Sequence, residues 1–198
     1  KYSDPSVWQG RRIAYTRSVA ANSMLGYILG IGDRHASNIL IDVSTAESVH
    51  IDFGIAFESG RLLAIPEIVP FRLTRDIVDG MGITGLEGTF RQSSEEVLNL
   101  LRDNTQQLLT ILEVIMHDPL NEWIILSNKS GTTSDQDNSE GPSAAAHRTL
   151  GRVKQRLQGY DERSGDCLNT QGTVRSLILQ ASDELNLSKM FCGWQAWL

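Results

Sequence analysis

Two stretches, Gly32-Asp-Arg-His-Ala-Ser-Asn38 and His50-Ile-Asp-Phe-Gly54, decide the fold of this chain. The segments 38–42 and 48–52 are short and rich in aliphatic residues, and five polar or small residues separate them. This pattern predicts an antiparallel β-hairpin with a longer loop. A loop before the first strand and a turn after the second lie at the same end of such a hairpin.

Three oxygen-bearing side chains are therefore expected to converge at that end: Asp33, Asn38 and Asp52. An amide oxygen and a carboxylate together suit Mg²⁺, which prefers oxygen ligands and keeps waters and phosphate oxygens around it. The remaining carboxylate, Asp33, could then accept a proton from an incoming hydroxyl. These are the parts that phosphoryl transfer needs. The same spacing, Asp to Asn by five with Asp-Phe-Gly downstream, occurs in protein kinases.

The order of the motif is Asp-Arg-His rather than His-Arg-Asp, which narrows the class of kinase. In this order and with the downstream Asp-Phe-Gly, the sequence resembles the phosphatidylinositol 3-kinase-related protein kinases. Further motifs carry the resemblance over nearly the whole chain, at 70–75, 79–85 and 191–198. One departure is Cys192, where tails of this kind commonly have proline before Gly-Trp.

The resemblance implies a mainly helical fold with a short hairpin, that is, the C-terminal lobe of a PI3/PI4-kinase-type fold plus a small helical tail. Asp33 would orient or deprotonate the substrate hydroxyl. His35 would stabilise the charge of the transferring phosphoryl group, and a share in the base role stays open for it. Asn38 and Asp52 would hold Mg²⁺ (or Mn²⁺) against ATP. The activation loop would run from Asp52 to about Thr74.

The family phosphorylates Ser or Thr followed by Gln in proteins of DNA-damage signalling, which implies a nuclear serine/threonine protein kinase. Damage-sensor complexes would be met through regions outside this chain, and a homodimer of the full-length protein is compatible with the resemblance. The 198 residues carry 18 basic and 24 acidic side chains, a net charge of −6. Bulk electrostatics therefore argue against nucleic-acid binding by this segment. No apolar run reaches the roughly 18 residues of a membrane span.

Three units are expected: a kinase lobe at 1–127, a flexible regulatory linker at 128–166 and an FATC-like C-terminal domain at 167–198. Apolar spacing predicts helices at 5–29 and 93–117, the first capped by Asp4 and the second by a capping box that begins at Ser93. Pro66 and Pro70 favour an ordered loop between about 53 and 75.

The region from 128 to 147 is too polar to bury a core, and a helix is expected to resume at about 145–158. In the tail, five apolar residues share one helical face: Val174, Leu177, Ile178, Ala181 and Leu185. Trp194 and Trp197 are interpreted as packing anchors. Cys167 and Cys192 are too few for a disulfide framework.

A phosphatidylinositol lipid kinase is the main alternative, because it would share both motifs. From Asp52 to Thr74 only Arg61 and Arg72 are basic, which suits a phosphorylated lipid poorly. Arg72 and Arg75 could instead contact phosphate or substrate, or anchor the loop through ion pairs. A two-metal phosphoesterase lacks further ligands, and a non-catalytic remnant is disfavoured because the residues for chemistry are present.

The nucleotide-binding part of a kinase, a Gly-rich loop and a strand Lys, cannot be found before Asp33. The chain also begins with Lys1 instead of Met. We therefore expect a piece of a longer enzyme that is inactive by itself.

Overall fold

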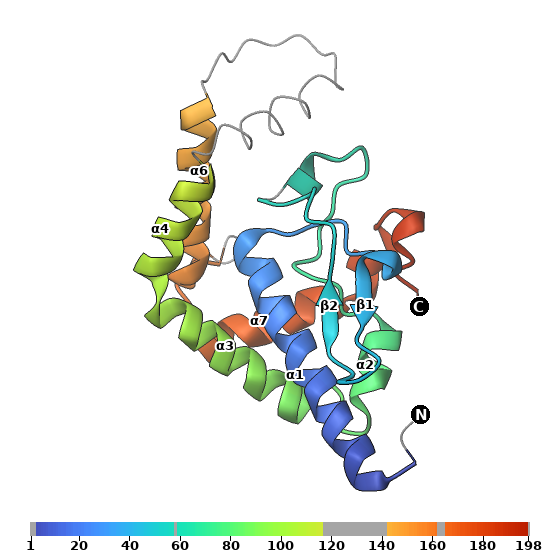
Figure 1. Cartoon of the computed structure of the whole chain (residues 1–198). Coiled ribbons are helices and arrows are strands. Elements are labelled where there is room, and N and C mark those ends of the chain that lie inside the picture. Colours follow the sequence, from blue (N-terminus) through green and yellow to red (C-terminus); the bar gives the residue numbers. More distant parts are fainter. Residues whose placement is uncertain (1–2, 58, 117–141, 162–164, 198) are drawn as a thin grey trace.

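The computed structural model of the protein describes residues 3–57, 59–116, 142–161 and 165–197. Over these residues the chain is mainly helical with one two-stranded antiparallel sheet, which confirms the predicted fold class (Figure 1). The helices and strands are α1 (Pro5–Leu29), β1 (Ile39–Ile41), β2 (Ser48–His50), α2 (Arg75–Met81), α3 (Arg91–Asp103), α4 (Thr105–Met116), α6 (Pro142–Leu157), α7 (Thr170–Ser182) and α8 (Glu184–Ser188). Short 3₁₀ turns lie at Ala36–Asn38, Ser59–Leu62 and Cys192–Trp194, and an irregular turn lies at Leu86–Phe90.

Helix α1 has the predicted bounds, and both of its caps explain why. The Asp4 side chain accepts hydrogen bonds from the backbone N–H groups of Ser6 at 2.7 Å and Val7 at 3.4 Å, while Pro5 fills the first turn. Gly30 ends the helix in the left-handed conformation, with φ of 63°. The helix packs against α2, α3 and β2, so it forms the central support of the hairpin.

The hairpin forms as predicted, although both strands are shorter than the segments 38–42 and 48–52. Cross-strand partners are Ile39 with His50, Leu40 with Val49, and Ile41 with Ser48. The backbone of Ser48 ties β2 to α1: its N–H donates to Ser18 Oγ at 2.8 Å and its carbonyl accepts from Asn22 Nδ2 at 2.9 Å. The hairpin is thereby fixed to a helix.

The single helix predicted at 93–117 is wrong, because α3 and α4 are separated at Asn104. The Asn104 side chain donates to the carbonyl of Leu100 at 2.8 Å, and such local side-chain bonds compete with the helical backbone. The capping box is also wrong, since α3 starts before Ser93 and buries it. Residue 117 lies outside the described residues.

The main core lies between α1, α3, α6 and α7. Phe90 and Leu98 are fully buried there, and each such side chain contributes roughly 1.5–3 kcal/mol by its removal from water. The other buried members come from α1, α2, α4, α6 and α7 and from the segment before α2: Val19, Ala20, Met24, Ile28, Phe71, Leu73, Met81, Leu112, Val153, Leu157, Val174, Leu177, Ile178 and Ala181.

Two boundaries differ from the expectation. Helix α6 starts at Pro142, inside the stretch 128–147 predicted to be linker, and residues 117–141 lie outside the described residues. Leu185 leaves the apolar face because Asp183 ends α7 and caps α8 by accepting from the Asn186 N–H at 2.8 Å. As a result Leu185 is exposed.

The end of the tail packs as a second, smaller cluster. Met190, Trp194 and Ala196 are buried against Val69 and Leu187. Trp194 is thus a packing anchor as predicted, whereas Trp197 is exposed. The 3₁₀ turn forms with Cys192 in place of the usual proline. Among the described helices, none has the length and apolarity that a membrane crossing requires.

Candidate active site

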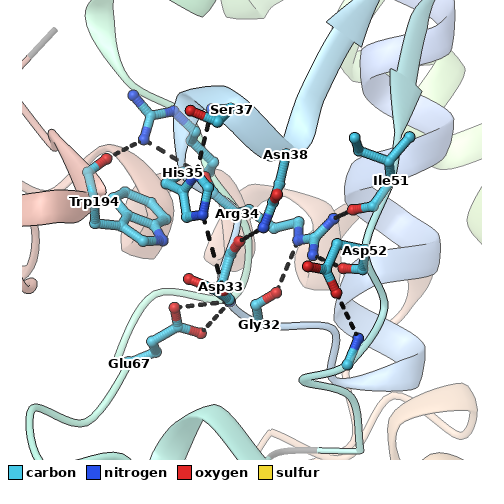
Figure 2. Close-up of polar contacts among 12 residues, drawn as sticks. Gly32, Asp33, Arg34, His35, Ser37, Asn38, Ile51, Asp52, Glu67 and Trp194 are labelled. Atoms are coloured by element: carbon cyan, nitrogen blue, oxygen red, sulfur yellow. Dashed lines mark hydrogen bonds and ion pairs between the residues drawn. The ribbon is translucent and has the colours of Figure 1, made fainter.

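The backbone of Asp33 is held on both sides by other side chains. Its φ is 56°, a left-handed conformation that costs a residue other than glycine roughly 1–2 kcal/mol. Its N–H donates to both carboxylate oxygens of Glu67, at 2.8 and 3.0 Å, and its carbonyl accepts from Asn38 Nδ2 at 2.9 Å (Figure 2). The Asp33 carboxylate takes no part in these backbone contacts.

Asp52 has nearly the same backbone conformation, with φ of 57°. One of its carboxylate oxygens, Oδ1, accepts from the N–H of Gly54 at 3.1 Å. Its carbonyl accepts from the guanidinium of Arg34. This leaves the second carboxylate oxygen, Oδ2, for a ligand.

The buried Arg34 side chain connects the loop before β1 with the turn after β2. It donates from Nε to the carbonyl of Gly32 and from Nη1 to the carbonyl of Ile51, both at 2.7 Å. Burial lowers the pKa of Arg34, while the nearby carboxylates of Asp33 and Asp52 act in the opposite direction. The arginine therefore fixes the end of the hairpin at which the three predicted side chains are grouped around it (Figure 2).

His35 lies beside Asp33, with 3.9 Å between Nε2 and Asp33 Oδ2. Its Nδ1 accepts from the N–H of Ser37 at 3.2 Å. Because Nδ1 is an acceptor, the proton of the neutral ring is assigned to Nε2, which faces the carboxylate as a donor. His50, by contrast, is partly buried on β2, and burial followed by the charge of Arg34 lowers its pKa to about 4.

Asn38 and Asp52 fit a hard cation by their donor chemistry. Asn38 is buried and uses its amide nitrogen on the Asp33 carbonyl, so its oxygen is available. One oxygen of Asp52 is similarly available. No group of three His, Cys, Asp or Glu side chains with metal-site geometry occurs in the part of the chain that the structure describes. Any cation here would take most of its ligands from phosphate and water, as Mg²⁺ commonly does.

Arg72 connects the site to the tail. It is buried, stacks on the Trp194 ring at 4.8 Å and donates to the carbonyls of Trp194 and Gln195, the latter at 3.1 Å. A longer bond of 3.5 Å reaches the carbonyl of Arg34. Arg72 therefore anchors backbone carbonyls, and the charge of Asp76 acts against the lowering of its pKa by burial. Arg75 is exposed at the start of α2.

Sequence reasoning missed two residues of this site. Arg34 lies inside the quoted motif, and its place between two candidate catalytic residues was the available signal. Glu67 gave no signal beyond an acidic residue between two prolines in an otherwise apolar loop. Its contact with Asp33 spans 34 residues of sequence, so no local pattern predicts it.

Comparison with known families matches residues 1–125 to the phosphatidylinositol 3- and 4-kinase family and residues 167–198 to the FATC domain. The chain therefore belongs to the phosphatidylinositol 3- and 4-kinase family. Within it, the chain is 52% identical to the serine/threonine-protein kinase ATM of Arabidopsis thaliana and 46% identical to the serine-protein kinase ATM of Sus scrofa, over all of its own length. It spans 5% and 7% of those relatives.

Solved structures agree with this placement. The FAT and kinase domain of CtTel1 matches 98% of the chain at 44% identity with a TM-score of 0.82, and the chain covers 13% of it. The butterfly symmetric dimer of Tel1 kinase matches all of the chain at 40% identity, also with a TM-score of 0.82, and 8% of that structure is covered. The resemblance to the phosphatidylinositol 3-kinase-related kinases is thus confirmed, and the ATM and Tel1 serine/threonine protein kinases are its homologues.

Proposed function

We propose that this chain is the catalytic lobe and tail of an ATM-type serine/threonine protein kinase. It would transfer the γ-phosphoryl group of ATP to Ser or Thr followed by Gln, in nuclear DNA-damage signalling. The observation that carries the proposal is the arrangement of Asp33, Asn38 and Asp52 around the end of one hairpin. Arg34 links the two sides of that end through the carbonyls of Gly32, Ile51 and Asp52. The homology to ATM and Tel1 kinases supports the reaction class.

In this proposal Asp33 acts on the substrate hydroxyl. Its carboxylate is uncommitted to the backbone, so it can orient the hydroxyl and accept its proton. The hydroxyl oxygen then bonds to the γ-phosphorus, the bond from that phosphorus to the β,γ-bridging oxygen breaks, and its electron pair leaves with ADP. The protein contributes mainly position and charge in such a reaction.

His35 and the two oxygen donors complete the proposed site. His35 presents its Nε2–H, so we assign it to hydrogen bonding with the transferring phosphoryl group rather than to the base role. Asn38 and Asp52 would hold Mg²⁺ or Mn²⁺. The bound cation would neutralise phosphate charge and align the phosphates.

The activation loop favours a protein substrate over a phosphoinositide. Of its two basic residues, Arg72 is buried and committed to backbone carbonyls, so it is not available to a lipid phosphate. The exposed side chains include several apolar ones: Leu62, Leu63, Ile65 and Ile68. A loop of this composition suits a peptide better than a polyanionic head group.

One face of the hairpin supports the expectation that this lobe needs a second one. Leu40 and Val49 are cross-strand partners and both are exposed, as are Ile51 and Phe53 next to the proposed metal ligands. We assign this apolar face to contact with a phosphate-binding lobe and the nucleotide base. Residues 1–198 alone are then expected to give no detectable peptide phosphorylation.

The same proposal includes the division of the chain into units and the partners of the full-length protein. We keep the division into a kinase lobe at 1–127, a regulatory linker at 128–166 and an FATC-like tail at 167–198, which the two matched family ranges support. Within the linker range, α6 packs into the main core through Val153 and Leu157. Damage-sensor partners would bind regions outside this chain. A homodimer of the full-length protein is supported by the symmetric dimers formed by Tel1.

A transfer assay on the full-length protein tests the function. Purified enzyme with labelled ATP and Mg²⁺ is offered a Ser-Gln peptide, the same peptide with Ser-Ala, and phosphatidylinositol vesicles. We expect label in the Ser-Gln peptide alone, and none with the Asp33→Ala variant. Labelled lipid without labelled peptide would establish the lipid-kinase alternative, and an active Asp33→Ala enzyme would remove Asp33 from the site.

A further inference from the structure

Glu67 joins the activation loop to the catalytic aspartate through the aspartate's backbone. Both of its carboxylate oxygens accept from the N–H of Asp33, at 2.8 and 3.0 Å (Figure 2). A hydrogen bond to a charged acceptor is roughly twice as strong as a neutral one. The contact therefore fixes the orientation of the peptide unit that precedes the Asp33 side chain.

The surroundings of the carboxylate leave it little freedom. A Cβ at Gly32 would lie 2.3 Å from Glu67 Oε2, and one at Gly60 would lie 2.5 Å from the same oxygen. The N–H of Glu67 also donates to the carbonyl of Gly60 at 3.0 Å. The two glycines thus form a close-fitting seat for this side chain, one on the catalytic loop and one on the activation loop.

The surroundings of Glu67 act on the ionisation of its carboxyl group in both directions. The pKa of Glu67 is raised overall, first by burial and also by the nearby Asp33 carboxylate, whereas the Asp33 N–H bond and the charges of Arg34 and His35 act to lower it. The side chain is partly buried and flanked by positive groups on the catalytic loop.

We propose that Glu67 is a positioning residue for phosphoryl transfer. By holding the Asp33 N–H, it keeps the aspartate in the left-handed conformation from which its carboxylate meets the substrate hydroxyl. The rate of the chemical step then depends on a correctly folded activation loop, because residues 59–67 seat the carboxylate. This inference rests on the proposed kinase activity.

The test uses the full-length enzyme with Glu67→Ala and Glu67→Gln, and Glu47→Ala as the matched control on the exposed hairpin loop. Loss of the carboxylate is expected to lower kcat by about 100-fold, as for a roughly 1 Å misplacement of a catalytic group. The KM for ATP should stay within about twofold, because Asp52 is still held through Arg34 and the Asn38 carbonyl still accepts from the Ile51 N–H at 3.1 Å. Glu67→Gln retains an acceptor oxygen and should recover about tenfold of the loss. Glu47→Ala should match the wild type.

Hydrogen exchange gives a readout independent of activity. Amide exchange in the peptide that contains Asp33 should accelerate in Glu67→Ala and less in Glu67→Gln, with the peptides of α3 unchanged. If the wild type is active and Glu67→Ala has the same kcat and the same amide exchange, the positioning role is wrong while the proposed function stands. Equal losses in Glu67→Ala and Glu67→Gln, or a rise in KM for ATP with kcat unchanged, would also overturn it. A wild type that transfers no phosphate overturns the proposed function instead.

Discussion

Asp33 and Asp52 adopt nearly the same left-handed backbone conformation, yet different groups hold them there. The peptide groups of Asp33 are held by the side chains of Glu67 and Asn38, and its own carboxylate does none of this work. Asp52 uses one of its own carboxylate oxygens on the Gly54 N–H, while Arg34 holds its carbonyl.

The difference matches the two proposed roles. A residue that orients and deprotonates a hydroxyl needs a carboxylate that makes no structural hydrogen bonds. Asp33 meets this need because the side chains of Glu67 and Asn38 hold its backbone instead. A metal ligand needs one well-directed oxygen, and the bond from Gly54 fixes the carboxylate of Asp52 while leaving the other oxygen exposed. Strained conformations of this kind persist where the surroundings over-determine them.

Alanine at each aspartate should have the largest effect and should separate the two roles. In the full-length enzyme, both Asp33→Ala and Asp52→Ala are expected to lower kcat by at least about 1,000-fold, from loss of the base or of the charge that holds the phosphates. Mg-ATP affinity, measured with a fluorescent nucleotide, should fall only in Asp52→Ala. Both proteins should unfold at the wild-type temperature within a few degrees. Weakened Mg-ATP binding in Asp33→Ala would contradict the division of roles.

Arg34→Met is the next test, because Arg34 supports the Asp52 side more directly than the Asp33 side. The variant removes donors from the carbonyls of Gly32, Ile51 and Asp52, which should cost about 2–4 kcal/mol of unfolding free energy. We expect kcat to fall about 100-fold, together with a higher Mg²⁺ requirement. The second change distinguishes it from Glu67→Ala. A normal Mg²⁺ requirement in Arg34→Met would show that Arg34 does not position Asp52.

Two glycine substitutions compare the surroundings of Asp33 and Asp52 without removing either aspartate or Arg34. A Cβ at Gly32 would meet Glu67 Oε2 at 2.3 Å, whereas one at Gly54 would meet Asp52 Oδ1 at 3.2 Å. Gly32→Ala must therefore displace Glu67 from the Asp33 amide, and we expect kcat to fall roughly 30-fold. Gly54→Ala needs only a small adjustment, so a loss of about threefold or less is expected. The reverse ranking, from the same steady-state assay, would mean that the Asp52 turn is the more sensitive one.

Local features of this fold could be predicted, since they depend on residues close in sequence. Helix α1 follows from Asp4, Pro5 and Gly30, and the hairpin follows from two aliphatic runs around a polar loop. Asp33, Asn38 and Asp52 were placed together because one hairpin connects them. The break at Asn104 was missed because its cause, a side-chain bond to the Leu100 carbonyl, competes with an apolar periodicity that continues across it.

The long-range hydrogen bonds that support the site could not be predicted from the sequence. Glu67 contacts Asp33 across 34 residues, and Arg72 contacts Trp194 across 122. Such contacts are set by how the segment before α2 and the C-terminal tail pack on the core, and residue spacing along the sequence does not predict them. Single-residue chemistry was a poor guide too: Arg72 could have bound phosphate, but its burial commits it to carbonyls.

Arg72→Met should affect chemistry less than Arg34→Met or Gly32→Ala, and it tests whether the tail supports the Asp33 side. The methionine keeps the apolar stem but leaves the carbonyls of Trp194 and Gln195 without their donor, at a cost of about 1–3 kcal/mol. Because Arg72 reaches the loop before β1 through a long bond of 3.5 Å to the Arg34 carbonyl, kcat is expected to fall less than about tenfold. Amide exchange at 190–197 should rise strongly, with Arg75→Met as the exposed control. A loss of activity as large as that of Arg34→Met would mean that the tail, in addition to Glu67 and Asn38, helps to hold Asp33 in place.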